Sequence, residues 1–266
     1  MLTDRDLRIT GWIGGLGAAG GEHVVTRFAT GRSLAFKRLA LLVGAGMLEQ
    51  RRLLYGRPAL YVATRAGLRA HGLEGLGAFR LGPGGFEHAW RVAEVAARVG
   101  AELADWEVLG EREFRWRERD AGELLASIKL PPPGGSERLH DVYHRPDLAL
   151  VSPAGRVVAV EVELTVKSRR RLESICRGWG RARHVEHTYY LATPSAAAAV
   201  GRGVKETCTE ELVTVLALDR VGEVVERERD GAREGRDHRP GVEAGAACDG
   251  EWWGLAPARY GEHRRL

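Results

Sequence analysis

The sequence predicts an α+β protein in two parts, an N-terminal winged helix-turn-helix over residues 1–78 and a three-layer α/β domain with a mixed sheet over residues 86–220. Helical and strand periodicities alternate along the chain, and a Gly/Pro-rich segment at residues 81–85 separates the two parts. The first part also ends in two short strand patterns around a turn. With 266 residues, of which 44% are hydrophobic, the chain is long enough to bury a sizeable core.

Composition and charge exclude several classes of protein. The sequence is 29% charged, and no apolar run approaches the ~18 residues of a membrane helix. The N-terminal residues are charged from position 4 onward and show no signal-peptide core. Three widely spaced cysteines argue against a disulfide framework and against a Cys-rich zinc site. We therefore expect a cytoplasmic protein with no membrane partner.

The first 78 residues show helix, helix, helix, two strands and helix in that order. Thr3 and Asp6 have the spacing of a capping box, and the helix that they begin ends at Gly14 and Gly15. A Gly/Pro turn at residues 55–58 joins the two strand patterns. The apolar residues of the first helix lie between residues 7 and 13. The other predicted helices cover residues 22–28, 32–43 and 65–71, and the predicted strands cover residues 47–54 and 59–63.

The third helix has the position of a recognition helix, which lies in the major groove of DNA. Residues 1–80 contain twelve Arg or Lys against five Asp or Glu, an excess typical of a surface that contacts phosphates. We expect Leu34, Leu39 and Leu42 on its buried face. The predicted DNA contacts are Arg32, Ser33, Phe36 and Lys37 on the exposed face of the helix, and Arg51, Arg52 and Arg57 on the wing. The alternative is a winged helix that contacts proteins, or a solvated basic face.

The second part alternates helices and strands, which is the pattern of a three-layer α/β domain. Helical patterns cover residues 87–103, 167–187 with a break at 178–180, and 194–207. Strand patterns cover residues 106–116, 143–151, 156–165, 188–192 and 212–218, and a Pro/Gly loop covers 130–136. Residues 221–266 are rich in Gly, Arg and Glu and have little periodicity, so we expect them to form a largely disordered tail.

Residues 145–165 predict a β-hairpin that turns at residues 153–155. If the two strands pair symmetrically about the middle of this turn, Asp147 lies directly opposite Glu161, with the two Cβ atoms about 5 Å apart. The period of two in the second strand places Glu161 and Glu163 on one face and only apolar residues on the other. The sequence therefore predicts a cluster of carboxylates at one end of a buried strand.

Carboxylates clustered in a buried strand repel one another and lose hydration unless a cation compensates them. Asp and Glu oxygens are preferred ligands of Mg²⁺ and Mn²⁺, so we predict such a metal on Asp147 and Glu161. The alternative is that the glutamates face solvent or pair with arginines of the following helix. His88 and His144 are secondary candidates, each of which either lines the site or fills a structural position.

A Pro-Asp dipeptide at Pro146, a hairpin, a Glu-x-Glu strand and a following basic helix together resemble the PD-(D/E)XK nuclease superfamily. The resemblance implies that Asp147 and Glu161 hold the metal and that Glu163 stands where a catalytic Lys is usual. Lys167 is then the residue that supplies the missing positive charge from a displaced position.

The same resemblance implies further residues of the site. An acidic residue from the first helix often joins the site in that superfamily, and Glu94 is the candidate here. Glu111 and Glu113, on the predicted strand 106–116, are the alternatives. Basic side chains of the helix after the acidic strand, Arg169 and Arg170 among them, would hold DNA phosphates near the acidic residues.

Four further signals extend over most of residues 1–220: Glu87-His88 at the start of a predicted helix, Trp106 followed by residues 111–113 (Glu-Arg-Glu), residues 145–147 (Arg-Pro-Asp), and residues 160–165 followed by Lys167. With these signals the chain as a whole resembles the replication-relaxation family, whose members look like a winged helix followed by a degenerate nuclease-like domain. The family is associated with plasmid replication and mobilisation. This resemblance implies a DNA context more than an activity. Together with the PD-(D/E)XK resemblance, it implies a DNA-binding protein with a metal-dependent endonuclease or nickase domain that acts on plasmid or other mobile-element DNA. The alternative is a catalytically inactive accessory or regulatory protein of replication or mobilisation. The implied partners are double-stranded DNA, replication or mobilisation proteins, and a second copy of the chain in a homodimer.

Overall fold

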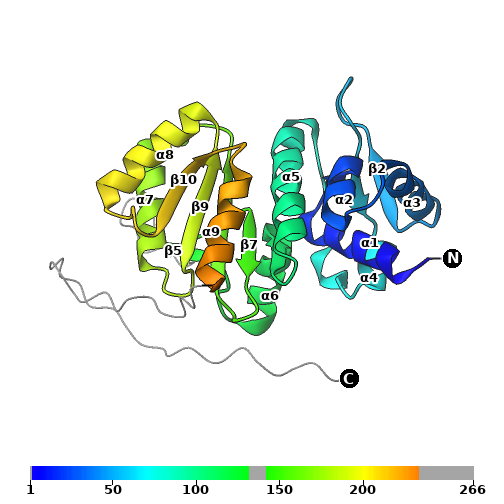
Figure 1. Ribbon diagram of the computed structural model, residues 1–266, viewed down its shortest axis with the longest axis horizontal. Coiled ribbons are helices and arrows are strands. Elements are labelled where there is room, and N and C mark those ends of the chain that lie inside the picture. The colour runs from blue at the N-terminus through cyan, green and yellow to red at the C-terminus, as the bar shows by residue number, and fades with distance from the viewer. Residues whose placement is uncertain (1, 132–141, 234–266) are drawn as a thin grey trace.

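The structure is a computed structural model that describes residues 2–131 and 142–233. It is a mixed α+β fold in which a helical N-terminal part packs beside a part built on a mixed sheet (Figure 1). None of the helices in the described ranges has the length and apolar character needed to cross a membrane. The predicted disorder of residues 234–266 and most of the predicted loop at 130–136 fall outside the described residues.

The N-terminal part contains the predicted helices and strands in the predicted order, and one very short strand in addition. The short strand is β1, which pairs with β3, so that the sheet has the antiparallel order β1-β3-β2. Two 3-10 turns, Glu74–Leu76 and Pro83–Gly85, follow these elements. The elements are α1 (Asp4–Leu16), β1 (Ala19–Gly20), α2 (Gly21–Phe28), α3 (Arg32–Gly44), β2 (Leu48–Arg51), β3 (Leu60–Ala63) and α4 (Arg65–Ala70).

Helix α3 buries a stripe of three residues, and one of them differs from the prediction. Leu39 and Leu42 are fully buried as expected, but Leu34 is 49% exposed and Ala35 is buried in its place. The reason is helical spacing, since residues 35, 39 and 42 follow the i, i+4, i+7 pattern and Leu34 lies about 100° away from that stripe. Helix α1 begins as predicted, because the carboxylate of Asp6 accepts a hydrogen bond of 2.7 Å from the backbone N–H of Thr3.

The second part is a five-stranded sheet of order β10-β9-β8-β7-β4, with a separate hairpin of β5 and β6. Strands β8, β9 and β10 run parallel to one another, and β7 runs antiparallel to both of its neighbours, β8 and β4. The elements are α5 (Phe86–Glu102), β4 (Glu107–Gly110), α6 (Glu111–Ala121), β5 (Ile128–Leu130), β6 (Val142–His144), β7 (Leu148–Val151), β8 (Val157–Glu163), α7 (Arg169–Arg181), β9 (His187–Ala192), α8 (Pro194–Thr207), β10 (Val213–Ala217) and α9 (Val221–Arg233).

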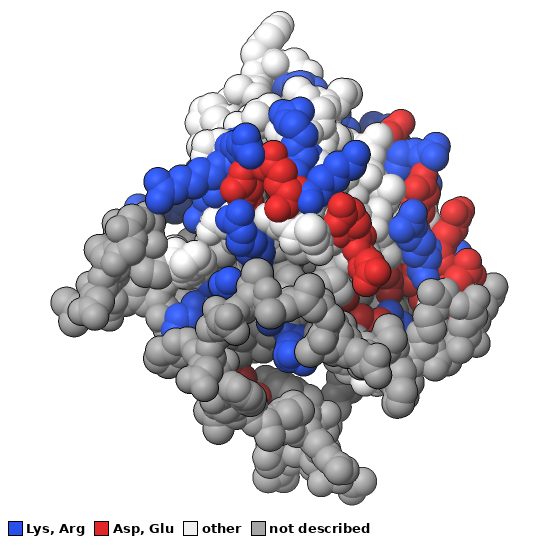
Figure 2. Space-filling model, turned by 90° about the vertical axis from the view of Figure 1, so that its left-hand side faces the viewer, with Lys and Arg blue, Asp and Glu red and all other residues white. Residues whose placement is uncertain are grey.

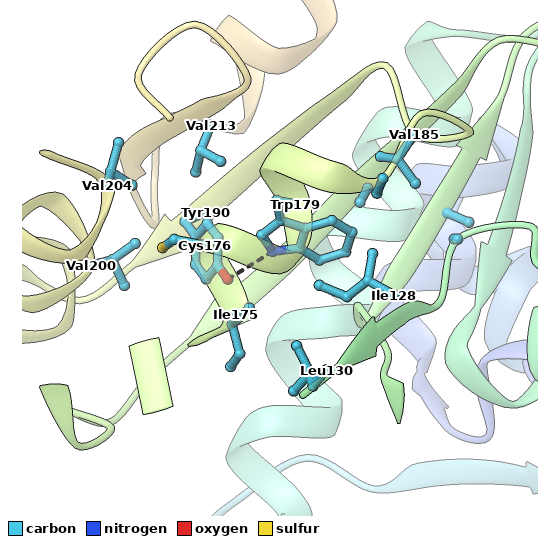
Figure 3. Packing of buried hydrophobic residues seen from close by; sticks show 14 of the residues in the cluster. Ile128, Leu130, Ile175, Cys176, Trp179, Val185, Tyr190, Val200, Val204 and Val213 are labelled. Carbon is cyan, nitrogen blue, oxygen red and sulfur yellow. Dashed lines mark hydrogen bonds between the residues drawn. The ribbon is translucent and has the colours of Figure 1, made fainter. Parts of the chain in front are cut away.

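Helices cover both faces of this sheet, which gives the predicted three layers (Figure 1). Helices α5 and α9 pack on the face that carries Val158 and Val160, whereas α7 and α8 pack on the face of Val157 and Ala159. Figure 3 shows the second of these cores, where the indole N–H of Trp179 donates to the hydroxyl of Tyr190 over 3.1 Å. Successive side chains of β8 point alternately into these two cores, because side chains of a strand alternate between the two faces of the sheet.

Three predicted strand or helix assignments in this part are wrong. Residues 106–116 do not form one strand, because the chain turns from β4 into helix α6, which buries Phe114 and Glu118 four residues apart. Residues 143–151 are split between β6 and β7, which belong to different sheets, around Pro146. The helix predicted over residues 167–187 covers only Arg169–Arg181, because β9 begins at His187. It continues through residues 178–180 without the expected break, with Trp179 packed in the core.

The start of the expected disordered tail is a helix. Helix α9 occupies residues 221–233 and buries Val221, Val224 and Val225 in the core between the sheet and α5. Glu228 is also buried, and its carboxylate accepts a hydrogen bond of 2.7 Å from the hydroxyl of Tyr189. The four buried residues lie on one face of the helix, at positions 221, 224, 225 and 228. This face packs in the core and stabilises the helix, although the rest of the segment is polar.

Helix α5 belongs to the cores of both parts. Its Ala93 lies in the core of the N-terminal part, and the ring of Trp90 lies 4.3 Å from the ring of His23. The opposite face of the helix places Val95 and Val99 in the core on the sheet. The Gly/Pro segment at residues 81–85 therefore does not separate two independent bodies, because the helix that follows it packs against both.

Candidate functional site

The hairpin register is the one predicted from the symmetric turn. Leu148 of β7 pairs with Val160 of β8, and Val151 pairs with Val157. Asp147, the residue before β7, is thereby carried to the ladder position opposite Glu161. The acidic pair predicted from the sequence thus stands at the same end of two adjacent, buried strands.

Asp147 is held at this position by contacts on both sides of its carboxylate. Oδ2 accepts a hydrogen bond of 2.7 Å from the backbone N–H of Val162, and Oδ1 lies 3.2 Å from Nε2 of His88 on α5. The side chain is 16% exposed, so it still reaches solvent. Its carbonyl oxygen accepts a hydrogen bond of 3.0 Å from the N–H of Glu111, which places the start of α6 directly beside it.

Glu161 is buried, with 4% of the residue exposed. Its carboxylate is hydrogen-bonded to Nε2 of His144, which is itself buried and lies edge-on to the ring of Trp179. The charge of Glu161 also affects Tyr190, its neighbour on β9. Burial raises the pKa of Tyr190 well above its ordinary value, the charges of Glu161, Cys176 and Glu163 raise it further, and the hydrogen bond from Trp179 lowers it. His144 therefore fills a structural position and contacts the site at the same time.

Glu163 is 5% exposed and forms an ion pair with Nζ of Lys167, four residues further on. Neither glutamate faces solvent or pairs with an arginine of α7, as the alternative predicted, because Glu163 pairs with Lys167 in the segment before α7 and Glu161 pairs with His144. Lys167 is partly buried, with 35% of its side chain exposed. The ammonium group thus lies at the acidic end of β8, where the displaced positive charge was expected.

Two further ionisable side chains experience the charges of this cluster. The hydrogen bond to Asp147 raises the pKa of His88 above its ordinary value, and the negative charges of Asp147 and Glu161 raise it further. Burial and the positive charge of Lys167 act in the opposite direction and lower this pKa. Desolvation raises the pKa of Glu111, as do the charges of Asp147 and Glu161, whereas Arg145 and Arg115 lower it. The end of β7 and β8 therefore gathers side chains from α5, α6 and the segment before α7.

The predicted first-helix acid is not part of this cluster. Glu94 is half-exposed on α5 and forms an ion pair of 2.8 Å with Arg91. It lies six residues beyond His88, on another face of the helix, and His88 is the residue of α5 that reaches Asp147. Of the two alternatives, Glu111 lies beside Asp147, whereas Glu113 pairs with Arg117 of the same helix.

The predicted phosphate-binding arginines of α7 lie at the end of the molecule drawn in Figure 2. There basic side chains surround a group of acidic ones, so this surface is mixed in sign rather than uniformly basic. Arg169 is exposed and pairs with both Glu173 and Glu206, over 2.7 and 2.9 Å. Arg170 is exposed on the first turn of the same helix.

The predicted DNA contacts of the N-terminal part are all at the surface. Ser33 and Lys37 are exposed on α3, and Arg32 pairs with Glu22 over 2.9 Å on the same surface. Two of the three wing arginines also have acidic partners: Arg51 pairs with Glu49 over 2.8 Å and Arg57 with Glu87 over 3.3 Å. Exposed pairs of this kind contribute about 0–1 kcal/mol each, so a phosphate can replace the carboxylate at small cost.

A group of basic and aromatic residues next to Asp147 was not predicted from the sequence. A cleft of about 760 Å³ lies between residues 75–80 and helix α6. Arginines and aromatic side chains from both sides and from the β6 segment line it. These residues come from three segments, 75–80, 111–124 and 143–145, which are separated by 30 and 18 residues. Because the first half of α6 lies within the predicted strand 106–116, nothing in the sequence indicates that the three segments meet. The cleft is lined by Phe79, Arg80, Arg112, Arg115, Trp116, Arg119, Tyr143 and Arg145 among others.

The acidic cluster has the donor chemistry of a Mg²⁺ or Mn²⁺ site, with carboxylates at the end of two strands. In the described part of the chain, however, no three His, Cys, Asp or Glu side chains are arranged as a ready set of ligands. Asp147 and Glu161 each have one carboxylate oxygen engaged by a histidine. Each carboxylate oxygen has a second lone pair, so Asp147 and Glu161, with Glu111 next to Asp147, still fit a cation as donors.

Comparisons with known proteins do not identify a family. No model of a known protein family matches the chain, and no curated protein matches it. Among solved structures, the crystal structure of protein VC1899 from Vibrio cholerae matches with a TM-score of 0.29 and 11% identity, over 86% of this chain and 57% of that chain. This chain thus matches little more than half the length of that protein. A similarity at this level carries no argument about fold or function, and the resemblances stated above remain predictions.

We predict that His88 titrates above the ordinary histidine value of about 6.5 in the metal-free protein. The stability that this raised pKa contributes is present below pH ~6.5 and is lost as pH rises through the folded-state pKa. Substitution of Asp147 by Asn removes the largest cause of the shift and should lower the pKa of His88. NMR titration of the histidine ring protons in EDTA, with His88→Gln for assignment, measures both values.

The matched control for this titration is Asp105→Asn, which removes one exposed carboxylate outside the cluster. It should leave the pKa of His88 unchanged. If Asp147→Asn also leaves that pKa unchanged, the contact between the two side chains does not exist in solution.

Proposed function

We propose that the protein binds DNA and that the acidic end of β7 and β8 is a metal-dependent phosphodiesterase site of the endonuclease or nickase type. The observation that carries this proposal is the hairpin register, because it brings Asp147 opposite Glu161 at the end of a strand buried on both faces. Carboxylates in such a position are costly unless they are paired or hold a cation. The three-layer arrangement with a mixed sheet also has the form that the PD-(D/E)XK resemblance implied.

Asp147 and Glu161 are the side chains that would hold Mg²⁺ or Mn²⁺, with Glu111 as a third donor. Such a metal would polarise a phosphate oxygen and lower the pKa of bound water. Lys167 stands at the end of the same strand and would stabilise the negative charge that develops on the phosphate. His88, hydrogen-bonded to Asp147 and half-exposed, would orient that carboxylate and is placed to exchange a proton with solvent.

The N-terminal part supports the DNA-binding half of the proposal. Its helices α2 and α3 are joined by a short turn and are followed by a two-stranded wing, which is the order of elements in a winged helix-turn-helix. Arg32, Ser33 and Lys37 lie on the exposed side of α3. We propose double-stranded DNA as the partner of this surface, in the cytoplasm, with plasmid or other mobile-element DNA as the source that the family resemblance implies. Replication or mobilisation proteins and a homodimer are proposed on the same ground.

One observation favours the alternative of a catalytically inactive accessory protein. Glu163 occupies the position where a catalytic lysine is usual, and its carboxylate takes up the charge of Lys167. Asp147 and Glu161 are likewise each compensated by a histidine. In this second proposal the acidic residues form a structural network, and the protein acts by binding DNA alone.

Cleavage distinguishes the two proposals. We predict that the purified protein nicks supercoiled plasmid with Mg²⁺ or Mn²⁺ and that Asp147→Asn slows nicking by about a hundredfold or more. Asn retains an oxygen that can accept the Val162 N–H, so this variant preserves the local fold better than Ala. Asp105→Asn is the matched control and should nick at the parent rate. A parent protein that nicks with neither metal supports the accessory function, and an unaffected Asp147→Asn variant assigns the activity to another site.

Binding to duplex DNA is predicted separately. Affinity should fall steeply as salt rises, because phosphate contacts release counterions. The pair Arg32→Ala and Lys37→Ala should weaken binding by about tenfold at low salt, as measured by fluorescence anisotropy. Lys205→Ala with Arg220→Ala removes the same charge at exposed positions of the second part and serves as the control. If the parent does not bind duplex DNA at low salt, the N-terminal part is a protein-interaction module.

A further inference from the structure

The cleft of about 760 Å³ beside the acidic cluster has the size of a small-molecule site. One wall is the segment of residues 75–80, which follows α4, and the other wall is helix α6. Tyr143 and Arg145, in and just after β6, complete the lining. The cleft is thus formed where the N-terminal part meets the sheet-bearing part.

Five arginines line this cleft, and none of them forms an ion pair with another described residue. Arginines elsewhere differ from these five: Arg91 on α5, Arg117 on α6 and Arg156 just before β8 each pair with two carboxylates. The five arginines of the cleft are Arg80, Arg112, Arg115, Arg119 and Arg145.

Two of these arginines also carry buried nitrogen atoms that lack a hydrogen-bond partner among the described residues. Arg112 is fixed in place, because its Nη2 donates to the carbonyl oxygens of Leu76 and Gly77 over 2.9 and 2.6 Å. Its Nη1 is buried and unpartnered, and so is Nε of Arg145. These two guanidinium groups are therefore held in place inside the wall of the cleft, and no carboxylate of the described residues neutralises them.

The acidic residues of the cleft do not balance its positive charge. Glu118 is buried, and its carboxylate is taken up by the backbone N–H groups of residues 125–127 and by the hydroxyl of Ser127. Glu111 and Glu123 are the remaining carboxylates of the lining. The cleft therefore presents more guanidinium groups than carboxylates to a ligand, which favours an anion.

Aromatic side chains specify the anion further. Phe79, Trp116 and Tyr143 line the cleft, and guanidinium groups lie 5.3 Å from the centre of the Phe79 ring and 5.6 Å from that of Tyr143. Aromatic rings combined with arginines bind the bases and phosphates of unpaired nucleotides. A simple anion such as inorganic phosphate would use the arginines alone and make no use of the rings.

The cleft adjoins the acidic cluster. A smaller pocket of about 120 Å³ shares Phe79, Glu111 and Arg112 with it, and His88 and Asp147 line the same small pocket. The large cleft therefore adjoins the residues around Asp147 at Phe79, Glu111 and Arg112. A duplex is too wide for such a cleft, whereas one nucleotide unit fits its volume.

We propose that this cleft binds a nucleoside phosphate, supplied either by a free nucleotide or by an unpaired nucleotide of a strand. The proposal goes beyond the proposed function, since binding here requires neither cleavage nor a metal. Its failure and the failure of the nuclease proposal are consequently separate results.

The test measures binding of a fluorescein-labelled thymidine tetranucleotide to the full chain in EDTA by anisotropy. Arg115→Gln with Arg119→Gln should weaken binding at least tenfold, because both side chains are exposed and their loss removes charge without disturbing a core. Arg220→Gln, at an exposed position on the second part, should change it less than twofold. Arg32→Ala with Lys37→Ala should also leave it unchanged, which excludes the surface of α3 as the binding site. Thermal melting by circular dichroism checks folding, and Arg119→Gln alone, with a threefold loss expected, replaces the double variant if that is unstable.

Competition identifies the source of the ligand. Displacement of the tetranucleotide by thymidine monophosphate indicates a free nucleotide, whereas displacement by unlabelled oligonucleotide alone indicates a nucleotide within a strand. Inorganic phosphate should compete at least tenfold less well than whichever of these binds. The proposal is overturned if the parent does not bind at low salt, if the arginine variants bind as the parent does, or if inorganic phosphate competes equally well.

Discussion

Two carboxylates buried at the end of the central strand β8 constrain the rest of this structure. All seven residues of β8 are buried, and the side chains of Glu161 and Glu163 share the face whose apolar residues pack under α7 and α8. Charges in such surroundings are expensive unless each has a partner. His144 serves Glu161 and Lys167 serves Glu163, so the β5–β6 hairpin and the segment leading into α7 are both tied to this strand end. Because these two buried carboxylates need charged or hydrogen-bonding partners, the end of β8 differs chemically from the rest of the sheet.

Helix α5 links this acidic end to the N-terminal part. His88 in its first turn contacts Asp147, while Trp90 and Ala93 pack against the N-terminal part. Close packing between the two parts extends to α6, because a Cβ atom at Gly15 of α1 would lie 2.0 Å from a carboxylate oxygen of Glu113. DNA held on α3 would consequently be fixed relative to the acidic cluster and the arginine-lined cleft. A flexible connection between the two parts would give no such fixed geometry.

The sequence predicted what depends on local pattern and failed where tertiary contacts decide. The β7–β8 register followed from a symmetric turn and from a strand that alternates between two cores. Residues 111–116 were assigned to a strand because alternating polar and aromatic residues resemble one, although Phe114 and Glu118 have helical spacing. Helix α9 has an apolar stripe with helical spacing at Val221, Val224 and Val225, but the polar composition of the segment favours the prediction of a disordered tail. The arginine-lined cleft could not have been predicted, because it is assembled from three segments distant in sequence.

The central claim is that the end of β7 and β8 holds a divalent cation, and metal binding tests it without reference to activity. Electron paramagnetic resonance of Mn²⁺ titrated into the purified protein separates free from bound metal. We predict bound Mn²⁺ on the parent, loss of that binding in Asp147→Asn and in Glu161→Gln, and no loss in Asp105→Asn. A parent protein that leaves Mn²⁺ free at millimolar concentration would contradict the claim, and the pairs of Asp147 with His88 and of Glu161 with His144 would then be structural alone.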